Sequence, residues 1–114
     1  MKNQSALREQ SKNSFMKMKA LLPELGKKFD VYFAEVYKEG ALDEKTKRLM
    51  ALTGALVSGS WACILAQTDR ALEYGANVQE ILEACAVAMS LGGTMAAGES
   101  TRVIQYLEEL EMIS

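Results

Sequence analysis

The chain has 114 residues, of which 49% are hydrophobic and one is proline, so it can form one domain with a buried core. Its net charge of −2 argues against nucleic acid as the main partner. The absence of histidine removes the commonest metal ligand and the commonest general base. We therefore expect a single domain over residues 1–114, with no zinc or haem site and no cofactor.

The distribution of charge and cysteine bears on partners and location. Residues 1–28 carry seven Lys and Arg against two acidic residues, whereas residues 69–114 carry eight acidic residues against two Arg. The basic segment either packs near acidic helices of its own or a neighbouring subunit, or serves as an arm for an anionic partner. Cys63 and Cys85 lack the spacing of a disulfide framework, and no signal peptide precedes them. Both features favour a reducing cytoplasm.

The first 40 residues predict two helices. Residues 5–22 form the first, with apolar positions among charges. Pro23 suits the first turn of the second, which runs to about residue 39 and ends at Gly40 in a left-handed cap. The side chains that we expect this second helix to bury are Leu25, Phe29, Phe33 and Val36, with Tyr32 and Tyr37 as further candidates.

Residues 43–75 predict a third and a fourth helix. Asp43 caps the third, a Ser-Gly-Ser break at 58–60 separates the two, and the fourth ends near Gly75. Residues 49–68 contain no charge in twenty positions, a length that could span a bilayer. The break in the middle, together with glycine, hydroxyl residues and Gln67, predicts two shorter helices and no membrane span.

The rest of the chain predicts a fifth and a sixth helix. Asn77 and Glu80 have the spacing of a capping box and open the fifth, and Gly92-Gly93 closes it. The sixth runs from about residue 95 to residue 111. No strand-like alternation competes, so the sequence predicts an all-α fold of six helices.

Two uncharged stretches, residues 49–68 and 84–98, predict assembly. A helix that is apolar nearly all round must be buried nearly all round, and six short helices cannot enclose two such segments in one subunit. The small residues that allow helices to approach closely are Gly54, Ala55, Ala86, Ala88, Gly92, Gly93, Ala96 and Ala97. We therefore expect copies of the same chain to cover the surplus apolar surface in a homo-oligomer.

Residues 45–101 carry a resemblance to a known family. They read KTKRLMALTGALVSGSWACILAQTDRALEYGANVQEILEACAVAMSLGGTMAAGEST, and RALEYGANVQEILEA is the most specific part. This block resembles the carboxymuconolactone decarboxylase family, which includes the alkyl hydroperoxidase D-like proteins. The resemblance implies a family core over residues 43–111, preceded by N-terminal helices in residues 1–40. It also implies an all-helical fold, assembly as trimers or hexamers, and a pocket lined by helices of this block.

The redox-active members of that family carry Glu, eleven residues, and then Cys-x-x-Cys-x-x-x-His. Aligned by the RALEYGA run, these four positions fall on Arg48, Ser60, Cys63 and Gln67, so one of the four is kept. The lactone decarboxylases lack the cysteine pair but keep a histidine at the position of Gln67. The chain lacks this histidine as well and fits neither pattern.

The altered motif allows two interpretations. Ser60, Cys63 and Gln67 are spaced i, i+3 and i+7 and share one helix face. If Ser60 is the N-cap, Cys63 lies in the first turn, where helix N–H groups favour a thiolate, and Arg48 could add positive charge. Ser60 and Gln67 would then position a peroxide or carbonyl substrate, and an external thiol would complete turnover unless Cys85 comes close in the fold. Alternatively, Cys63 is an ordinary buried cysteine and Arg48 pairs with Glu44 on the solvent face.

Two functions of different classes follow. The first is a peroxidase-like, thiol-dependent enzyme that acts on a small molecule through Cys63. The second is a non-catalytic oligomeric protein that binds an apolar or weakly acidic ligand. A decarboxylase acting on a small carboxylated lactone without Cys63 is a further alternative, since Arg48 or Arg70 could hold a substrate carboxylate.

Overall fold

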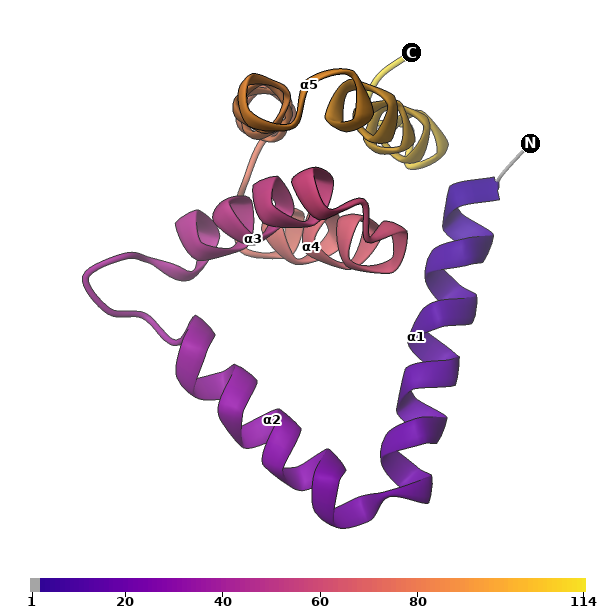
Figure 1. Cartoon of the computed structure of the whole chain (residues 1–114), viewed down its shortest axis with the longest axis vertical. Coiled ribbons are helices and arrows are strands. Elements are labelled where there is room, and N and C mark those ends of the chain that lie inside the picture. Colours follow the sequence, from indigo (N-terminus) through magenta and orange to yellow (C-terminus); the bar gives the residue numbers. More distant parts are fainter. Residues whose placement is uncertain (1–2) are drawn as a thin grey trace.

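The computed structural model describes residues 3–114, which form five α-helices and no strand. These are α1 (Asn3–Leu21), α2 (Pro23–Tyr37), α3 (Glu44–Ser58), α4 (Trp61–Glu73) and α5 (Val78–Glu109). The predicted all-α fold is confirmed. In Figure 1, α3, α4 and α5 pack together, while α1 and α2 form a V-shaped arrangement beside them. We call the first part the helical body and the second the hairpin.

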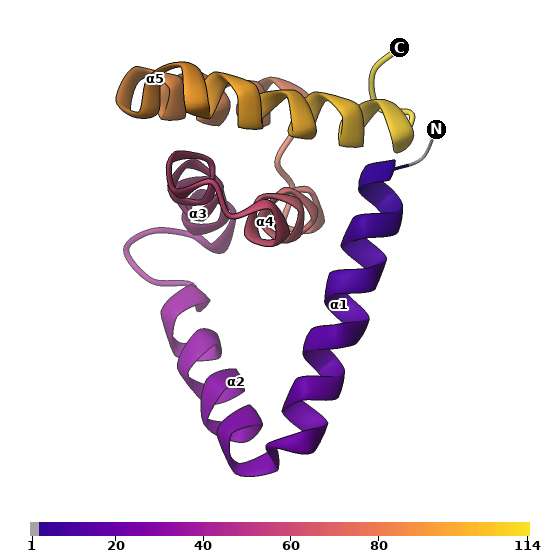
Figure 2. The same cartoon turned by 45° about the vertical axis from the view of Figure 1, so that its right-hand side comes forward.

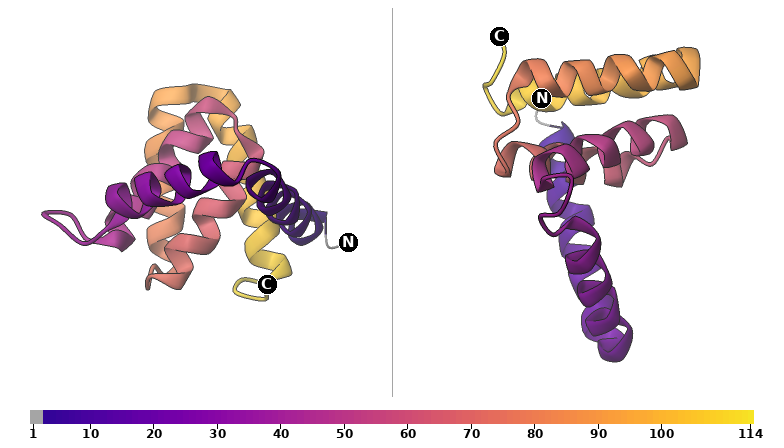
Figure 3. Two further views of the ribbon diagram at one scale, coloured as in Figure 1. Left: turned by 90° about the horizontal axis from the view of Figure 1, so that it is seen from below. Right: turned by 90° about the vertical axis from the view of Figure 1, so that its left-hand side faces the viewer.

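Helix α5 changes direction at Gly93, where φ is 64° and ψ is −143°. Residues other than glycine rarely adopt this conformation. The two halves of α5 lie next to each other as separate rods (Figures 1 and 3). The predicted stop at Gly92-Gly93 is therefore present as a kink within one long helix, and the predicted count of six helices is not confirmed.

Local side-chain signals set the ends of the body helices. The carboxylate of Asp43 accepts a hydrogen bond from the backbone N–H of Thr46 at 2.7 Å and begins α3. Gly59 ends α3 in a left-handed conformation with φ of 74°. Asn77 and Glu80 accept hydrogen bonds from each other's backbone N–H groups at 2.8 and 3.0 Å, and this capping box begins α5. All three predicted signals are confirmed.

Helix α2 begins with Pro23 in its first turn, as predicted, but ends earlier than predicted. Its C-cap residue is Lys38, which has extended backbone angles, and Gly40 does not have a positive φ. The prediction of a left-handed cap at Gly40 is therefore wrong. Instead, Nζ of Lys47 donates hydrogen bonds to the carbonyl oxygens of Val36 and Lys38 at 2.9 and 2.7 Å. A side chain from α3 thus satisfies the end of α2.

The hydrophobic core lies within the helical body and receives side chains from all three of its helices. Its fully buried members include Leu52, Leu56, Ile64, Ile81, Ala88, Val103 and Leu107. In the hairpin, by contrast, the buried residues are Gln4 and Gly26. Gly26 lies so close to α1 that an added Cβ would be 3.0 Å from the backbone oxygen of Lys19. Glycine at this position therefore allows α1 and α2 to meet.

The hairpin contacts the body near its two ends. The carboxylate of Glu109 accepts hydrogen bonds from the backbone N–H groups of Gln4 and Ser5 at 2.9 and 2.7 Å, which satisfies the start of α1. Nε of Arg8 lies 2.6 Å from Oδ2 of Asp69 on α4. At the other end, α3 holds the end of α2 as described. Figures 1 and 2 show that the tip of the hairpin projects away from the body.

The predicted burial of the apolar side chains of α2 is wrong for three of them within a single chain. Leu25, Tyr32 and Val36 are 54%, 64% and 40% exposed. Phe29 and Phe33 are half-buried, and their rings stack with centroids 4.1 Å apart. The physical reason is that the hairpin meets the body only at its ends, so no helix of the same chain covers the exposed side of α2.

The chain is more open than a self-contained domain of its size. Its accessible surface is 7019 Å², whereas a compact 12.5 kDa protein exposes about 6,200 Å². Its radius of gyration is 14.3 Å, against about 13 Å for a compact domain of this length. The projecting hairpin accounts for this difference.

Among the described residues, α5 is the one helix with the length and apolar composition of a membrane span. Core helices of soluble proteins meet the same criteria, so this is weak evidence for a span, and the kink at Gly93 divides the helix. The other long uncharged run, residues 49–68, is split by Gly59 into α3 and α4, as predicted.

Candidate functional site

The four predicted site residues lie on two neighbouring helices of the body. Arg48 is in the second turn of α3, Ser60 is the N-cap residue of α4, and Cys63 and Gln67 follow on α4. Nη1 of Arg48 donates a hydrogen bond to Oε1 of Gln67 at 3.2 Å. The structure therefore joins Arg48 to Gln67, and helical spacing places Ser60 and Cys63 on the same face of α4 as Gln67.

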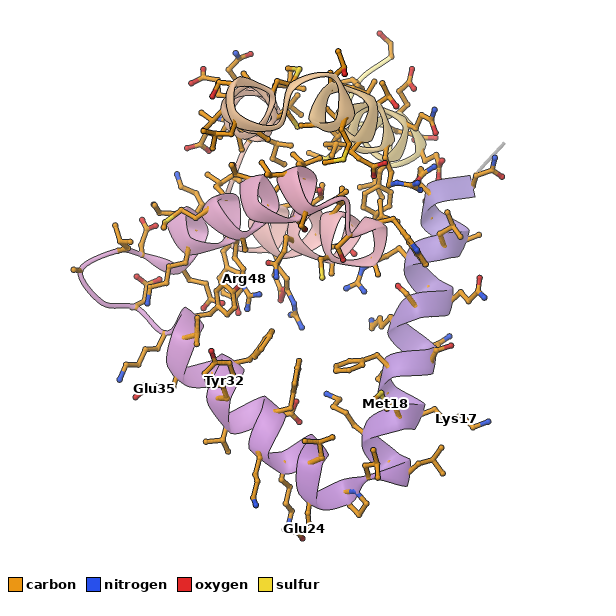
Figure 4. All side chains as sticks on the ribbon, viewed as in Figure 1. Lys17, Met18, Glu24, Tyr32, Glu35 and Arg48 are labelled. Atoms are coloured by element: carbon orange, nitrogen blue, oxygen red, sulfur yellow. The ribbon has the colours of Figure 1, made fainter. Side chains whose placement is uncertain are left out.

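Arg48 is held on three sides. In addition to Gln67, its Nη2 and Nε donate hydrogen bonds at 3.0 and 3.2 Å to one carboxylate oxygen of Glu44. Its guanidinium lies 3.6 Å from the centroid of the Tyr37 ring, a cation–π contact. Figure 4 shows Arg48 on the side of α3 that faces the hairpin.

The predicted alternative of an Arg48–Glu44 pair is confirmed, but the pair does not lie on the solvent face. The two side chains are only 12% and 15% exposed. Because the Glu44 carboxylate is in contact with the guanidinium, it balances most of the positive charge of Arg48. In the part of the chain that the structure describes, the hydrogen bonds of Arg48 go to Glu44 and Gln67 and not to the sulfur of Cys63.

Cys63 is exposed, so the interpretation of an ordinary buried cysteine is wrong within one chain. It is the third residue of α4 and lies in the first turn. Unpaired backbone N–H groups and the helix dipole favour a negative charge at this position. The side chain of Ser60 makes no capping hydrogen bond, so its hydroxyl is not engaged at the end of the helix.

Cys85 has the opposite environment. It is buried in α5, and burial raises the pKa of its thiol. Both cysteines are free thiols. The chain therefore contains one exposed thiol at a helix N-terminus and one buried thiol that resists ionisation, and each serves as a control for the other.

Arg70, the other arginine considered for carboxylate binding, is a surface residue. Its Nη1 lies 2.9 Å from a carboxylate oxygen of Glu73, and its side chain is 48% exposed. Arg48 is likewise paired with Glu44. Both guanidiniums thus already have an acidic partner, and neither is prearranged to take the carboxylate of a substrate.

The sequence did not predict the polar cluster around Asp69. Its carboxylate accepts hydrogen bonds from the Tyr106 hydroxyl at 2.5 Å and from Nε of Arg8 at 2.6 Å. Burial, followed by the hydrogen bond to Asp69, raises the pKa of Tyr106. Tyr37 was also not expected beside Arg48. These residues belong to different helices, so no spacing within one helix indicates that they meet.

Residues 3–114 contain no group of three or more His, Cys, Asp or Glu side chains placed to hold a metal ion. Two of the shallow hollows on the surface are defined by the side chains that line them. One is lined by Lys27, Lys28, Val31 and Tyr32, and the other by Glu108, Glu111, Met112, Ile113 and Ser114. Neither hollow includes a predicted site residue, so in the single chain the exposed Cys63 is not part of either.

Comparison with known sequences identifies relatives of the chain. Residues 23–106 match the sequence profile of the carboxymuconolactone decarboxylase family. Uncharacterized protein 4 of the cox locus from Paracoccus denitrificans is 32% identical over 76 residues, which cover 67% of this chain and 68% of that protein. An uncharacterized protein from Cupriavidus necator is 27% identical over 73 residues, which cover 64% of this chain and 65% of the relative.

Solved structures share the arrangement of the whole chain. A carboxymuconolactone decarboxylase family protein from Legionella pneumophila, in its apo form, superposes with a TM-score of 0.89 at 26% identity, over 96% of this chain and 97% of that chain. A family member from Thermotoga maritima, for which a role in the antioxidative response has been suggested, gives a TM-score of 0.72 at 32% identity, over 86% and 90% of the two chains. Because the profile spans most of the sequence and the structural match spans hairpin and body together, the chain belongs to the carboxymuconolactone decarboxylase family.

Proposed function

We propose that the chain is a thiol-dependent enzyme that reduces a small peroxide through Cys63. The observation that carries the proposal is the contrast between the two cysteines: Cys63 is exposed in the first turn of α4, whereas Cys85 is buried and its pKa is raised. A helix N-terminus favours the thiolate that such a reaction needs. The role in the antioxidative response suggested for the Thermotoga maritima relative is consistent with this chemistry.

The proposed reaction has two stages. The Cys63 thiolate attacks one oxygen of the peroxide, the O–O bond breaks, and the sulfur becomes a sulfenic acid while the other oxygen leaves as an alkoxide or hydroxide and takes a proton from water. A small external thiol then condenses with the sulfenic acid to form a mixed disulfide and water. A second external thiol displaces Cys63, which returns as a thiol, and the two external thiols leave as a disulfide.

The neighbouring residues bind and orient the substrate in this proposal. The free hydroxyl of Ser60 and the amide of Gln67 flank Cys63 on one face of α4 and offer hydrogen bonds to the peroxide oxygens. Arg48 fixes the amide of Gln67 through the hydrogen bond at 3.2 Å. Since Glu44 balances the charge of Arg48, we assign Arg48 a positioning role, and we assign the activation of the thiol to the helix N-terminus.

The test is a mass measurement after brief exposure to one equivalent of peroxide at pH 6, with dimedone present to trap sulfenic acid. We expect rapid modification of the wild type and of Cys85→Ser at residue 63, at a pH well below the ordinary thiol pKa of about 8.5. Cys63→Ser is expected to remain unmodified. Equal labelling of Cys63→Ser, or no labelling of the wild type, would exclude the thiol mechanism.

The hydrogen bonds of Arg48 and Gln67 favour a second function, which is the binding of a small apolar or weakly acidic ligand without catalysis. At these positions the redox-active members of the family carry Glu and His, and here the two side chains hydrogen-bond to each other and to Glu44. This arrangement supplies no general base. If binding is the function, ligand affinity will survive Cys63→Ser, whereas the peroxide reaction will not.

We further propose that the protein acts in the cytoplasm as a homo-oligomer, a trimer or a hexamer. The exposed thiol and the absence of a disulfide are consistent with a reducing compartment. The surplus accessible surface of the chain supports assembly. Side chains of other copies would then enclose the surface around Cys63 and form a pocket there.

A further inference from the structure

The contact between Tyr37 and Arg48 links the hairpin to the candidate site. Tyr37 is the last residue of α2, and its ring centroid lies 3.6 Å from Cζ of Arg48 on α3. Arg48 in turn donates a hydrogen bond from Nη1 to Oε1 of Gln67 on α4 at 3.2 Å. The contacts that begin in α2 therefore end on α4, one helical turn from Cys63.

The ring of Tyr37 restricts Arg48 in a direction that its hydrogen bonds leave free. The donors of a guanidinium point within its plane, so the hydrogen bonds to Glu44 and Gln67 fix the group within that plane but resist tilting poorly. An aromatic ring against the flat side of the group resists tilting. Because the Arg48 side chain is only 12% exposed, water screens this cation–π contact little.

The position of Tyr37 is itself fixed. Nζ of Lys47 donates hydrogen bonds at 2.9 and 2.7 Å to the carbonyl oxygens of the residues on either side of Tyr37. The ring of Phe33 packs against the ring of Tyr37, with centroids 5.9 Å apart. Two consecutive residues of α3, Lys47 and Arg48, thus hold the backbone around Tyr37 and its ring.

Arg48 determines which end of the Gln67 amide remains for a ligand. A guanidinium has donors only, so the amide must turn its oxygen, and not its NH2 group, toward Arg48. In residues 3–114, the hydrogen bond described for this side chain is the one that its oxygen accepts. The NH2 group is therefore left as a donor on the helix face that carries Cys63.

A fixed N–H donor at this place suits the proposed reaction. When the thiolate attacks one peroxide oxygen and the O–O bond breaks, negative charge develops on the other oxygen. A donor already aimed at that oxygen stabilises the charge in the transition state. If the amide could rotate, its oxygen would face the leaving oxygen part of the time, and this stabilisation would be lost.

We propose that Tyr37 is a positioning residue for the peroxide reaction and that the hairpin controls the site through it. The ring of Tyr37 holds Arg48, Arg48 orients the amide of Gln67, and the amide NH2 group donates to the leaving oxygen. The inference rests on the proposed function and describes the control of the same site. It does not require Tyr37 or Arg48 to touch the substrate.

The test compares Tyr37→Leu with Tyr37→Phe, which keeps the ring, and with Tyr32→Leu, which removes an exposed ring from the same helix (Figure 4). Dimedone trapping and mass measurement give the rate of sulfenic acid formation at Cys63 over a series of peroxide concentrations. We expect Tyr37→Leu to react about tenfold more slowly, as for the loss of one hydrogen bond in the transition state. Tyr37→Phe and Tyr32→Leu should react at the wild-type rate.

Two further measurements distinguish positioning from damage to the fold. The rate at which iodoacetamide alkylates Cys63 at different pH values depends on ionisation of the thiol and not on Gln67, so the profile of Tyr37→Leu should match that of the wild type. The NH2 signals of Gln67 in proton–nitrogen NMR spectra can be identified by their absence in Gln67→Leu. We expect these signals to shift in Tyr37→Leu and to stay in place in Tyr37→Phe.

The possible failures are distinguishable. A wild type that does not react with peroxide would overturn the proposed function and this inference with it. A reactive wild type together with an equally fast Tyr37→Leu, or with unchanged Gln67 signals in that variant, would overturn the inference alone. So would a Tyr37→Phe as slow as Tyr37→Leu, or an altered iodoacetamide profile in Tyr37→Leu, because the ring would then not act through Gln67.

Discussion

Arg48 is the residue on which the geometry of the candidate site depends. It orients Gln67, contacts the ring of Tyr37 and neutralises Glu44, so it connects the hairpin, α3 and α4. A guanidinium suits this position because its planar, forked donors can reach two acceptors while its face lies on an aromatic ring. Lysine could not make all of these contacts at once.

Replacing Arg48 with leucine is therefore expected to destabilise the fold by about 1–3 kcal/mol, since it leaves the mostly buried Glu44 without its partner. Urea unfolding measures this change. The matched control is Arg70→Leu, which removes the exposed pair with Glu73 and should cost less than about 1 kcal/mol. Equal losses of unfolding free energy in the two variants would mean that the burial of the Arg48–Glu44 pair does not affect stability.

The raised pKa of Tyr106 predicts how the free energy of unfolding changes at alkaline pH. Burial and the hydrogen bond to Asp69 raise its pKa in the folded state above the ordinary value, so above about pH 10 the unfolded chain loses this proton while the folded chain retains it. The unfolded state then binds fewer protons, and the free energy of unfolding falls as pH rises.

We expect the wild type to lose stability between pH 9 and 11, and Tyr106→Phe to lose less over that range, although it is less stable at pH 7 by about 1 kcal/mol because the hydrogen bond is missing. Urea titrations at each pH provide the measurement. Tyr74→Phe, at an exposed position, should follow the wild-type profile. If the free energy of unfolding falls equally with pH in Tyr106→Phe and in the wild type, Tyr106 is not the group responsible for the loss of stability.

At the scale of elements, α5 depends on a single glycine conformation. The kink at Gly93 lets one half of the helix return beside the other, and both halves contribute to the core of the body. An added Cβ at Gly93 would meet no atom within 4 Å, so any effect of a side chain there comes from the backbone angles and not from a clash. Gly98 offers the matched comparison, because it also has open space around it but lies in regular helix.

Gly93→Ala is thus expected to lower the free energy of unfolding by about 1–3 kcal/mol. Gly98→Ala is expected to raise it by about 0.5–1 kcal/mol, because alanine favours the helix. Chemical unfolding of both variants checks the sign of each change. If both variants shift in the same direction, the kink does not impose the predicted strain.

At the scale of the whole molecule, the chain has a compact body and an open hairpin, and these two parts should differ in stability. The body has the core, whereas the hairpin exposes an apolar face and is held near its ends. Assembly would bury this face and add binding free energy to folding, so the observed stability should depend on protein concentration.

We expect the thermal midpoint of the wild type to rise with protein concentration between about 1 and 100 μM, because only the folded chain assembles. Differential scanning fluorimetry measures the thermal midpoint at each protein concentration. A midpoint independent of concentration in the wild type would argue against assembly through any surface.

Most features that depend on neighbours in the sequence were predicted correctly, with the cap at Gly40 as the exception. Asp43, Pro23 and the Asn77–Glu80 capping box act within one helical turn, and the predicted breaks at residues 58–60 and 92–93 fall where Gly59 and Gly93 take a positive φ. The common face of Ser60, Cys63 and Gln67 also follows from helical periodicity. These signals are local, so one sequence is enough to predict them.

Features that depend on which helices meet were not predicted. The sequence showed that α2 has an apolar side, but not that the hairpin would stand away from the body and leave Leu25, Tyr32 and Val36 exposed. It did not show that Lys47, and not Gly40, would complete the end of α2, nor that Asp69 would gather Arg8 and Tyr106 from two other helices.

By itself, the sequence determined the all-helical architecture, most helix ends and the placement of Cys63 in a first turn, because each follows from spacing along the chain. The family was indicated by the resemblance of residues 45–101. The tertiary structure alone decided that Arg48 is neutralised by Glu44 and held against Tyr37, that Cys63 is exposed while Cys85 is buried, and that apolar side chains of α2 remain exposed. Burial and charge pairing depend on segments far apart in the sequence, and only the packing of whole helices brings those segments together.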